Sequence, residues 1–323
     1  VHGDPEKIRK RIRFIQWWFF GRERADDLFA AAFTADGDPA GHVGYTRTEL
    51  SGGGSPIAAA VLSSAMTDPK LRGSGVFSLL MRHLMESAAA ADIDLLVGSP
   101  NSRSGRVFLG RLGFTGIFHS IRAGRPVRWE WLGQRFGAPG RLVAGAAGHL
   151  CDAVIPLRVR GYHYHAGAEL PDGFQRFIQE AVQPAACHVV RTPEYCRWRF
   201  SHPDREYRHI ALRDPGDRLA GWAAVYLGSH GNRSRIHIGD YWVTGEDARA
   251  FRALMAAVRE VALQEGADEM YWAGRTCSPT YNLRRLGFIS RKSDNPVIAF
   301  SPTGRDLTAL DRWEFRDTDV DMF

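Results

Sequence analysis

The chain has 323 residues, and its 42 lysines and arginines against 36 aspartates and glutamates give a formal net charge of +6. That surplus falls short of the concentrated basic face of a dedicated nucleic-acid-binding protein, but it suits anionic small molecules such as nucleotides. The composition, 44% hydrophobic and 24% charged, is that of a soluble globular protein, and the length suits two domains. We therefore expect two domains, a small-molecule partner and no nucleic acid.

The cysteines and the apolar stretches bear on compartment and cofactors. The cysteines form no Cys-x-x-Cys pair and no metal-ligand cluster with nearby histidines: they are Cys151, Cys187, Cys196 and Cys277. We expect reduced thiols, a cytoplasmic setting and no bound metal. Residues 1–13 are charged and lack the apolar core of a signal peptide. Residues 142–157 are too short to span a bilayer. They form either a membrane-surface helix or a buried connector; we favour the connector and expect no stable membrane insertion.

The sequence contains a repeat. A shift of 174 residues aligns 77–114 with 251–288 without a gap. Identical residues fall at matching positions along the whole run, including Phe77 and Phe251, Asp94 and Asp268, Ser104 and Ser278, and the Leu-Gly-Phe endings at Phe114 and Phe288. Chance is a poor explanation for such a run, so we infer two copies of one fold. The expected division is a first domain at 1–136, a connector at 137–170 and a second domain at 171–323.

The first copy predicts alternating strands and helices. An apolar run at 57–67 indicates a buried strand, and a glycine-containing turn follows it. A helix comes next, with apolar residues three and four apart at Phe77, Leu80, Met81, Leu84, Met85 and Ala88. A second strand at 94–98, a turn and a short helix at 103–111 follow. Gly113 is expected to end that helix before a last strand.

The second copy repeats this order and completes an α/β (α+β) prediction. We expect a strand at 237–243, a helix at 247–264, a strand at 269–272 and a short helix ended by Gly287. Between the copies, residues 137–140 predict a loop, which a connecting helix follows.

The glycine-containing turn of the first copy is a candidate anion site. Residues 70–75 follow a predicted strand and precede a predicted helix. Free backbone amides and the helix dipole at such a position favour a bound phosphate or diphosphate. Gly73 and Gly75 let a ligand approach the backbone because they have no Cβ. A plain tight turn is the alternative, which the surrounding strands and helix make less attractive.

Residues 70–75, Lys-Leu-Arg-Gly-Ser-Gly, resemble the pyrophosphate loop of the GNAT acyltransferase superfamily, Gln/Arg-x-x-Gly-x-Gly/Ala, with lysine in first place. Residues 98–114 are similar to its second CoA-binding segment, in which Asn101 meets the pantetheine arm. The resemblance implies two tandem GNAT-like domains with mixed, mostly antiparallel sheets, and acyl-CoA as co-substrate. It also implies a set of CoA-binding residues: Met66, Thr67, Lys70, Leu71, Arg72, Gly73, Ser74, Gly75, Val76, Asn101, Ser104 and Phe108.

The second copy lacks these features. Glu246, Asp247 and Arg249 stand where Arg72, Gly73 and Gly75 stand in the first copy, and Arg275 replaces Asn101. Carboxylates repel a diphosphate, and side chains crowd its approach. We therefore expect one CoA site, in the first copy, and a degenerate second copy that contributes to the acceptor site between the halves.

Within the superfamily, the chain resembles bacterial N-acyltransferases of nucleotide-linked amino sugars. The resemblance lies in Gly-Ser-Pro-Asn101 with Ser104, in Tyr195-x-x-Trp198-x-Phe200, and in residues 313–319. It implies acylation of such a sugar. The alternatives are an antibiotic, amino acid or thiol precursor as acceptor, transfer from aminoacyl-tRNA, and a non-catalytic acyl-CoA-binding or regulatory module. The intact diphosphate loop argues against the last two.

Acyl transfer needs a polarised thioester carbonyl, a deprotonated amine and a stabilised thiolate. The resemblance assigns the carbonyl to a backbone amide of 65–67. Phe108 and Leu109 stand where many members carry a tyrosine acid, so Ser104 or a water would replace it. Asp240 is the candidate base because it interrupts an apolar strand, although a structural carboxylate is the alternative.

The remaining site predictions concern the acceptor. The catalytic set is Asp240, Asn101 and Ser104. The acceptor set is Asp240, Trp313, Asp317 and Asp319; for the C-terminal aspartates, a solvated acidic tail is the alternative. The aromatic residues 17–20 either line an acyl pocket or, as we favour, belong to the core.

Overall fold

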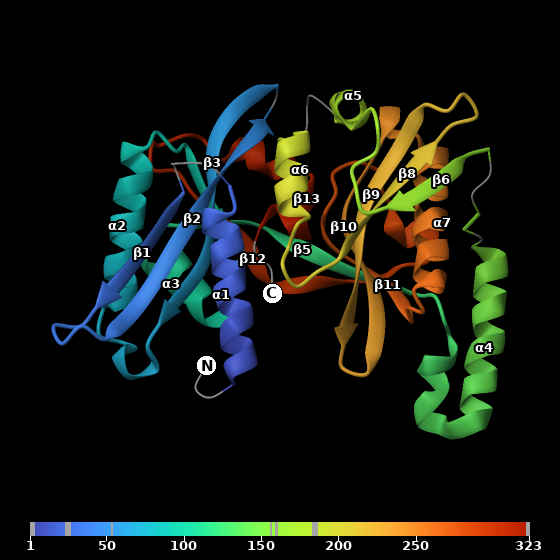
Figure 1. The fold of residues 1–323 in the computed structure, drawn as a ribbon, viewed down its shortest axis with the longest axis horizontal. Helices are drawn as coiled ribbons and strands as arrows, with labels where there is room; N and C mark the ends of the chain where they lie inside the picture. The colour runs from blue at the N-terminus through green and yellow to red at the C-terminus, as the bar shows by residue number, and fades with distance from the viewer. Residues whose placement is uncertain are drawn as a thin grey trace. The chain divides into compact units, whose positions relative to one another are not determined.

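The protein is described from a computed structural model that covers residues 4–22, 27–52, 54–155, 157–158, 161–182 and 187–320. The chain forms two compact units (Figure 1). Unit 1 comprises Val1–Ser120, Pro184–Val190 and Ser293–Phe323, and unit 2 comprises Ile121–Gln183 and Arg191–Lys292. Each unit has a mixed, mostly antiparallel sheet flanked by helices, as the sequence predicts.

Unit 1 contains α1 (Pro5–Phe20), β1 (Leu28–Phe33), β2 (Pro39–Gly52), β3 (Ser55–Thr67), α2 (Val76–Ala90), β4 (Leu95–Gly98), α3 (Ser102–Arg111), β7 (His188–Val189) and β13 (Phe315–Arg316). It also holds the first half of β5 (Thr115–Pro126) and most of β12 (Ile289–Phe300). The strand order is β1-β2-β3-β4-β12, and β7 pairs with β2. Strands β3 and β4 run parallel, whereas β1 with β2, β2 with β3, β2 with β7 and β4 with β12 pair antiparallel.

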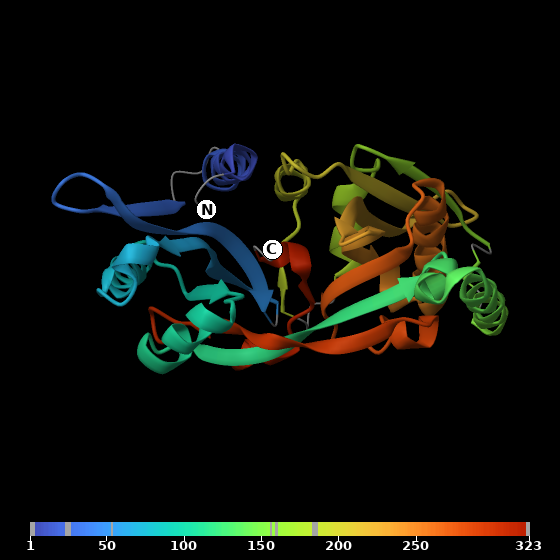
Figure 2. The same ribbon diagram turned by 90° about the horizontal axis from the view of Figure 1, so that it is seen from below.

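The two faces of this sheet carry different helices (Figure 2). Side chains alternate along β2, and Val43 packs with α2 in one hydrophobic cluster. The next residue, Gly44, faces α1, because a Cβ there would lie 2.5 Å from the Phe19 ring. On the same face, Thr46 Oγ1 donates to the carbonyl of Trp18 at 3.5 Å. Trp18 and Phe19 are thus core residues, in line with the favoured interpretation, whereas Phe20 is 67% exposed and does not belong to the core.

Unit 2 contains α4 (Gly137–Val154), β6 (His163–Gly167), α5 (Phe174–Ala181), α6 (Pro193–Arg199), β8 (Tyr207–Arg213), β9 (Leu219–His230), β10 (Arg233–Val243), α7 (Ala248–Gln264) and β11 (Glu269–Arg275), together with the end of β5. The strand order is β5-β11-β10-β9-β8-β6, with β10 and β11 parallel. Short 3-10 turns occur in both units, at Pro69–Leu71, Glu130–Phe136, Thr244–Glu246, Leu283–Leu286, Thr308–Arg312 and Asp317–Asp319.

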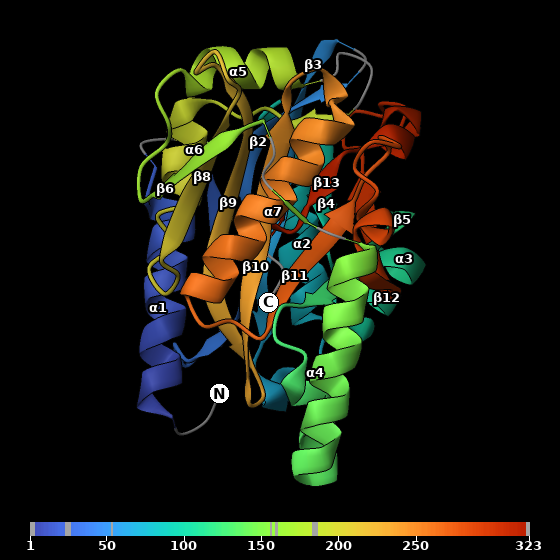
Figure 3. The same cartoon turned by 90° about the vertical axis from the view of Figure 1, so that its right-hand side faces the viewer.

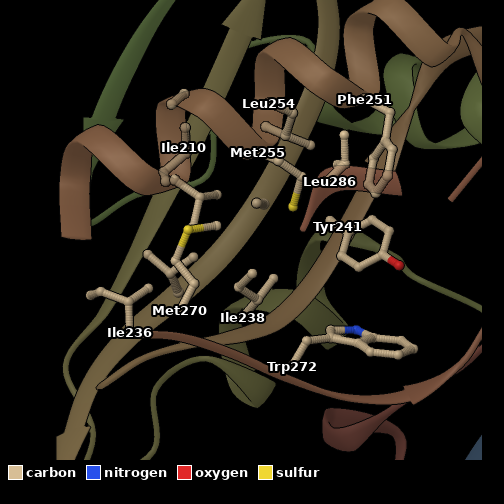
Figure 4. Close-up of a cluster of buried hydrophobic side chains, with 14 of the residues drawn as sticks. Ile210, Ile236, Ile238, Tyr241, Phe251, Leu254, Met255, Met270, Trp272 and Leu286 are labelled. Carbon is tan, nitrogen blue, oxygen red and sulfur yellow. The ribbon is translucent and has the colours of Figure 1, made fainter. Parts of the chain in front are cut away.

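The main core of unit 2 lies between α7 and one face of its sheet (Figures 3 and 4). Phe251 and Leu254 of α7 pack there with Ile238 and Met270 of the central strands, and all four side chains are buried. A second cluster contains residues of α5 and α6, and in it Phe174 meets Trp222 edge to face at 4.9 Å. This sheet is therefore buried on both faces, which explains its nearly continuous apolar strands.

The repeat is confirmed by matching contacts in the two copies. Asp94 accepts a hydrogen bond from the amide of Ala58 (3.2 Å), and its own amide donates to the Ala58 carbonyl (2.8 Å). Asp268 makes the same pair of bonds with Ser234, both at 2.9 Å. Each aspartate thus fixes the start of a parallel strand pair. Identical roles at aligned positions are what a duplicated fold requires.

Glycine ends the short helical segment in both copies, as expected. Gly113 follows α3 with a φ of 73°, and Gly287 follows a 3-10 turn with a φ of 79°. Only glycine adopts this left-handed conformation without strain. The next residue, Phe114 or Phe288, then enters the core of its unit.

The last strands of the two copies are exchanged. Under the 174-residue shift, β5 and β12 coincide at both ends. β5 nevertheless pairs with β11 of the second copy, over residues 121–126, and β12 pairs with β4 of the first copy, over 298–300. The compact units therefore differ from the expected division at 1–136, 137–170 and 171–323. Linear boundaries fail because each copy receives its last strand from the other.

The connector also differs from expectation. Residues 137–140 are the start of α4 instead of a loop. Three apolar side chains of α4 are 67–76% exposed: Leu142, Val143 and Leu150. The expectation of a buried connector is therefore wrong. The side of α4 that packs against the preceding segment carries glycines, and Gly148 lies directly against the Trp129 ring, so the apolar side chains are left exposed. Among the described residues, no helix has the length and apolar character needed to cross a bilayer.

Buried histidines in unit 2 predict loss of stability in acid. Burial lowers the pKa of His209 to about 4, and its Nδ1 accepts a hydrogen bond from Trp222 Nε1 at 3.3 Å. The unfolded chain binds a proton near pH 6.5 and the folded chain only near pH 4, so stability falls as pH decreases through that window. At pH 5 this one group costs about 2 kcal/mol.

Urea unfolding at pH 7 and pH 5 measures this effect. His209→Gln, which keeps an acceptor for Trp222 but does not titrate, is expected to reduce the difference between the two pH values. His149→Gln, at an exposed position on α4, is the matched control and should leave the difference as it is in the wild type. Equal pH dependence in all three proteins would contradict the assignment.

Candidate functional site

The loop at 70–75 has the conformation of an anion-binding turn. Gly73 has a φ of 88° and Gly75 a φ of 94°, values that residues with a Cβ rarely adopt. A Cβ built on either glycine meets no atom within 4 Å, so the space beside the loop is open. The positive φ angles therefore require glycine at both positions. This is a second reason for the two glycines, in addition to the close approach of a ligand that the sequence suggested.

The first turn of α2 has no side-chain cap. The helix begins at Val76 with Gly75 as its N-cap residue, which offers no oxygen to the first amides. Ser74 is held by its Oγ and its amide, which both donate to the carbonyl of Leu71, at 2.7 and 3.2 Å. Lys70 and Arg72 are exposed in the same segment. Uncapped amides, the helix dipole and two cations together make this segment attractive to an anion.

The corresponding helix of the second copy is capped by its own carboxylate. Asp247 is the N-cap residue of α7, and its Oδ1 accepts from the amide of Arg249 at 2.7 Å. Helices α2 and α7 end at aligned positions, but α7 starts two residues earlier relative to the alignment. In the second copy, the first turn of α7 and its N-cap Asp247 thus occupy the positions that the glycine loop has in the first copy. An internal anion occupies the amides that a diphosphate would use, which agrees with a degenerate second copy.

The end of β3 is separated from β4. The parallel pairing of the two strands stops at Val61, opposite Val97. A β-bulge follows, in which Ser64 has a φ of 57°. After the bulge, the amide of Asp68 donates to the carbonyl of Ala40 and so points toward β2. Backbone amides of successive residues in a strand point in opposite directions, so the amide of Thr67 points away from β2, toward the side where β4 no longer pairs. Met66 and Thr67, the expected thioester-binding residues, lie at this free strand end, where Met66 is 43% exposed.

Asp240 does not have the surroundings of a catalytic base. It follows a bulge in β10, much as Met66 follows the bulge in β3. Its side chain is 1% exposed and pairs with the buried Arg191, Oδ2 to Nε 2.5 Å. Oδ1 accepts from the amide of Tyr241 at 2.8 Å. The carboxylate is therefore engaged and shielded from solvent, which corrects the expectation of a cleft-facing base and acceptor ligand and supports the structural alternative.

The predicted pantetheine segment combines capping and core residues. Asn101 is the N-cap residue of α3: its Oδ1 accepts from the amides of Arg103 and Ser104, both at 3.0 Å, and from Ser104 Oγ at 3.2 Å. The Asn101 side chain is exposed, and its amide group remains a donor. Phe108 is buried between Phe77 and Phe114, edge to face. It supports the helix and offers little surface to a ligand.

The C-terminal residues predicted to bind the acceptor are buried. Trp313 packs edge to face against Phe315 at 5.4 Å and is fully inaccessible. Asp319 accepts from the amide of Arg316 at 2.8 Å and is 2% exposed. Burial therefore corrects the acceptor prediction for these two residues, and it also excludes the alternative of a solvated tail for Asp319. The side chain of Asp317 lies outside the described structure.

Other polar residues, which the sequence did not single out, lie beside the bulge of β3. Arg11 of α1 donates to Ser64 Oγ at 3.1 Å, and His42 on β2 is paired with Met66. These residues are far apart in sequence, and a single histidine within a predicted strand does not by itself indicate a functional site. Within the described ranges, no three His, Cys, Asp or Glu residues gather into a candidate metal site.

Comparison with known proteins bears on the first copy directly. Residues 7–117 match the family described as "Acetyltransferase (GNAT) domain". That range contains the glycine loop, the end of β3 and the start of α3. No curated protein matches the chain.

Solved structures extend the likeness to the whole chain. A GCN5-related N-acetyltransferase from Anabaena variabilis matches with a TM-score of 0.60 at 12% identity, over 94% of this chain and 72% of the other. A tandem GNAT protein from the clavulanic acid biosynthesis pathway matches with 0.56 at 16% identity, over 87% and 85%. Saccharomyces cerevisiae N-myristoyltransferase with bound myristoyl-CoA matches with 0.54 at 11% identity, over 92% and 80%.

Identities this low establish the fold alone. The chain has the tandem GNAT fold, with the acetyltransferase match confined to its first part. An acetyltransferase (GNAT) domain at residues 7–117 within a tandem GNAT fold supports the assignment of this chain as an acyltransferase.

Proposed function

We propose that the protein binds acyl-CoA at the first copy and transfers the acyl group to the amine of a small acceptor. The observation that carries the proposal is the contrast between the corresponding helix starts of the two copies. In the first copy the amides before Val76 are uncapped and two glycines open the approach. In the second copy Asp247, which aligns with Gly73, caps a helix that starts two residues earlier relative to the alignment. One diphosphate site, not two, is the expected result.

In this proposal each segment of the donor has a place along the first copy. The diphosphate lies at residues 72–76, where the backbone amides and the cations Lys70 and Arg72 neutralise its charge. The pantetheine arm follows the open edge of β3 and receives a hydrogen bond from the Asn101 amide group. The thioester carbonyl accepts from the peptide of Thr67, which stabilises the oxyanion as the amine adds. Side-by-side placement of the two reactants supplies much of the rate.

For the acceptor, we propose a nucleotide-linked amino sugar, on the resemblance noted in the sequence. An antibiotic, amino acid or thiol precursor is the second candidate. The similarity to a tandem GNAT protein of the clavulanic acid pathway favours that candidate. Four free cysteines support a reducing compartment for either reaction, and we propose the cytoplasm.

Thiol release tests the function and separates the acceptors. Acetyl-, butyryl- and myristoyl-CoA are each incubated with panels of nucleotide amino sugars, aminoglycosides and amino acids, and free CoA is measured. We expect amine-dependent release with one acyl-CoA and one acceptor class. Calorimetry with each acyl-CoA provides the prior check, because a protein that binds none of them cannot have the proposed function.

A further inference from the structure

His42 lies beside the strand end proposed to hold the thioester. It stands opposite Met66 in the antiparallel ladder of β2 and β3. Paired Cα atoms in such a ladder are about 5 Å apart. Alternation along β2 places His42 on the same face as Gly44, which is the face that α1 covers. The imidazole is therefore one strand away from the peptide of Thr67, on the α1 side of the sheet.

The His42 ring is held by packing but has a nitrogen without a partner. It stacks on Phe29 of β1, with ring centroids 5.3 Å apart and an interplanar angle of 29°. Its Nε2 is buried and has no hydrogen-bond partner in the described structure. Buried polar atoms of this kind are uncommon and ask for an explanation, such as a group that arrives with the substrate.

The surroundings keep the imidazole neutral. Burial, and after it the positive charge of Arg11, lower the pKa of His42 below its ordinary 6.5. Arg11 comes from α1, whereas the neighbouring strands present Phe29 and Met66, which do not titrate. At neutral pH the ring therefore has a nitrogen lone pair available, the state that a proton acceptor requires.

No other described histidine of unit 1 combines these features. His83 is exposed on α2. His119 is engaged through Nδ1 with the carbonyl of Ser293 at 2.9 Å. His188 lies on β7, which pairs with the opposite end of β2 from His42.

We propose that His42 Nε2 accepts the proton of the acceptor amine during acyl transfer. The proposal rests on the acyl-CoA-dependent function proposed above and assigns to the first copy the base that Asp240 does not provide. The acceptor then approaches from the α1 face of the sheet, where the unpartnered nitrogen lies.

The step balances in atoms and protons. The acceptor arrives as an ammonium group, and His42 takes one proton to become imidazolium. The free amine adds to the thioester carbonyl, so that a C–N bond forms and the carbonyl oxygen becomes an oxyanion. Collapse of this intermediate breaks the C–S bond, and the second amine proton ends on the thiolate. The products are an amide and the CoA thiol, and the imidazolium returns its proton to solvent.

The test compares His42→Gln with His83→Gln as the matched control. The assay uses acetyl-CoA and the amine that gives the fastest thiol release. We expect His42→Gln to lower kcat by about 100-fold, with the KM and the calorimetric Kd for acetyl-CoA unchanged. The kcat of the wild type should fall only below pH 6.5, because the pKa of His42 is lowered. This decrease in kcat at acid pH should be absent in His42→Gln. Imidazole added to His42→Ala should restore part of the rate.

The outcomes separate the two proposals. If wild-type protein binds no acyl-CoA, the proposed function fails. If binding and turnover are normal but His42→Gln keeps kcat within about threefold of wild type, with the same acid limb, only the role of His42 is overturned. Ring NMR of the full-length protein adds a readout that needs no acceptor. Saturating acetyl-CoA should shift the His42 signals and leave those of His83 in place, whereas a His42 signal that does not respond contradicts the proposed placement.

Discussion

Replacing Gly73 with valine is expected to weaken acetyl-CoA binding by about 100-fold or more, whereas Asp247→Val should leave it within about twofold of wild type. The first change forces a β-branched residue into a φ of 88° and puts a side chain into the open space beside the loop. Both effects act on the backbone amides that would hold the diphosphate. Calorimetric titration with acetyl-CoA measures the difference.

Asp247→Val is a matched control because it alters the aligned position of the second copy. It removes the cap of α7 and the contact from Tyr162 Oη at 3.1 Å, so a stability loss of about 1 kcal/mol is expected there. Circular dichroism of both variants checks that each is folded. Equal losses of binding in the two would contradict the asymmetry, and unchanged binding in Gly73→Val would remove the loop as the diphosphate site.

Breaking the buried pair of Asp240 and Arg191 should destabilise the protein strongly. Asp240→Ala leaves the Arg191 guanidinium without its carboxylate in a site where both side chains are almost fully buried. Loss of one partner of such a pair costs about 3–5 kcal/mol. The urea midpoint for unfolding of unit 2, followed by tryptophan fluorescence, should fall accordingly.

The double variant Asp240→Leu/Arg191→Met separates a structural from a catalytic role. It removes both charges and keeps apolar volume, so it should recover much of the lost stability. If the carboxylate is structural, thiol release recovers with it. A stable double variant with no thiol release would restore Asp240 as a catalytic candidate.

The repeat and the position of the proposed donor loop could be read from the sequence because both depend on local signals. Glycines at 73 and 75 and apolar residues at helical spacing act within a few positions, and the self-alignment supplies an internal comparison. The bounds of β3, α2 and β4 accordingly fall within two residues of those expected.

The acceptor side could not be predicted because it depends on distant partners. Asp240 interrupts an apolar strand, which fits both a cleft residue and a buried ion pair. Only the fold shows that Arg191, 49 positions away in sequence, supplies the opposite charge. The proposed role of His42 is hidden in the same way. Its pairing with Met66 depends on the register of β2 with β3, and no periodic pattern encodes which strand a histidine will face.

The exchange of β5 and β12 explains why a half without a ligand loop persists. A gene duplication usually leaves one copy free to be lost once it has no function of its own. Here, deletion of either half would leave β4 or β11 with an open edge of unpaired amides and carbonyls, a template for aggregation. We infer that the second copy is retained as a folding partner. Under the proposed function, its positions aligned with the glycine loop are free to change, while the strand that it lends to the first copy is not.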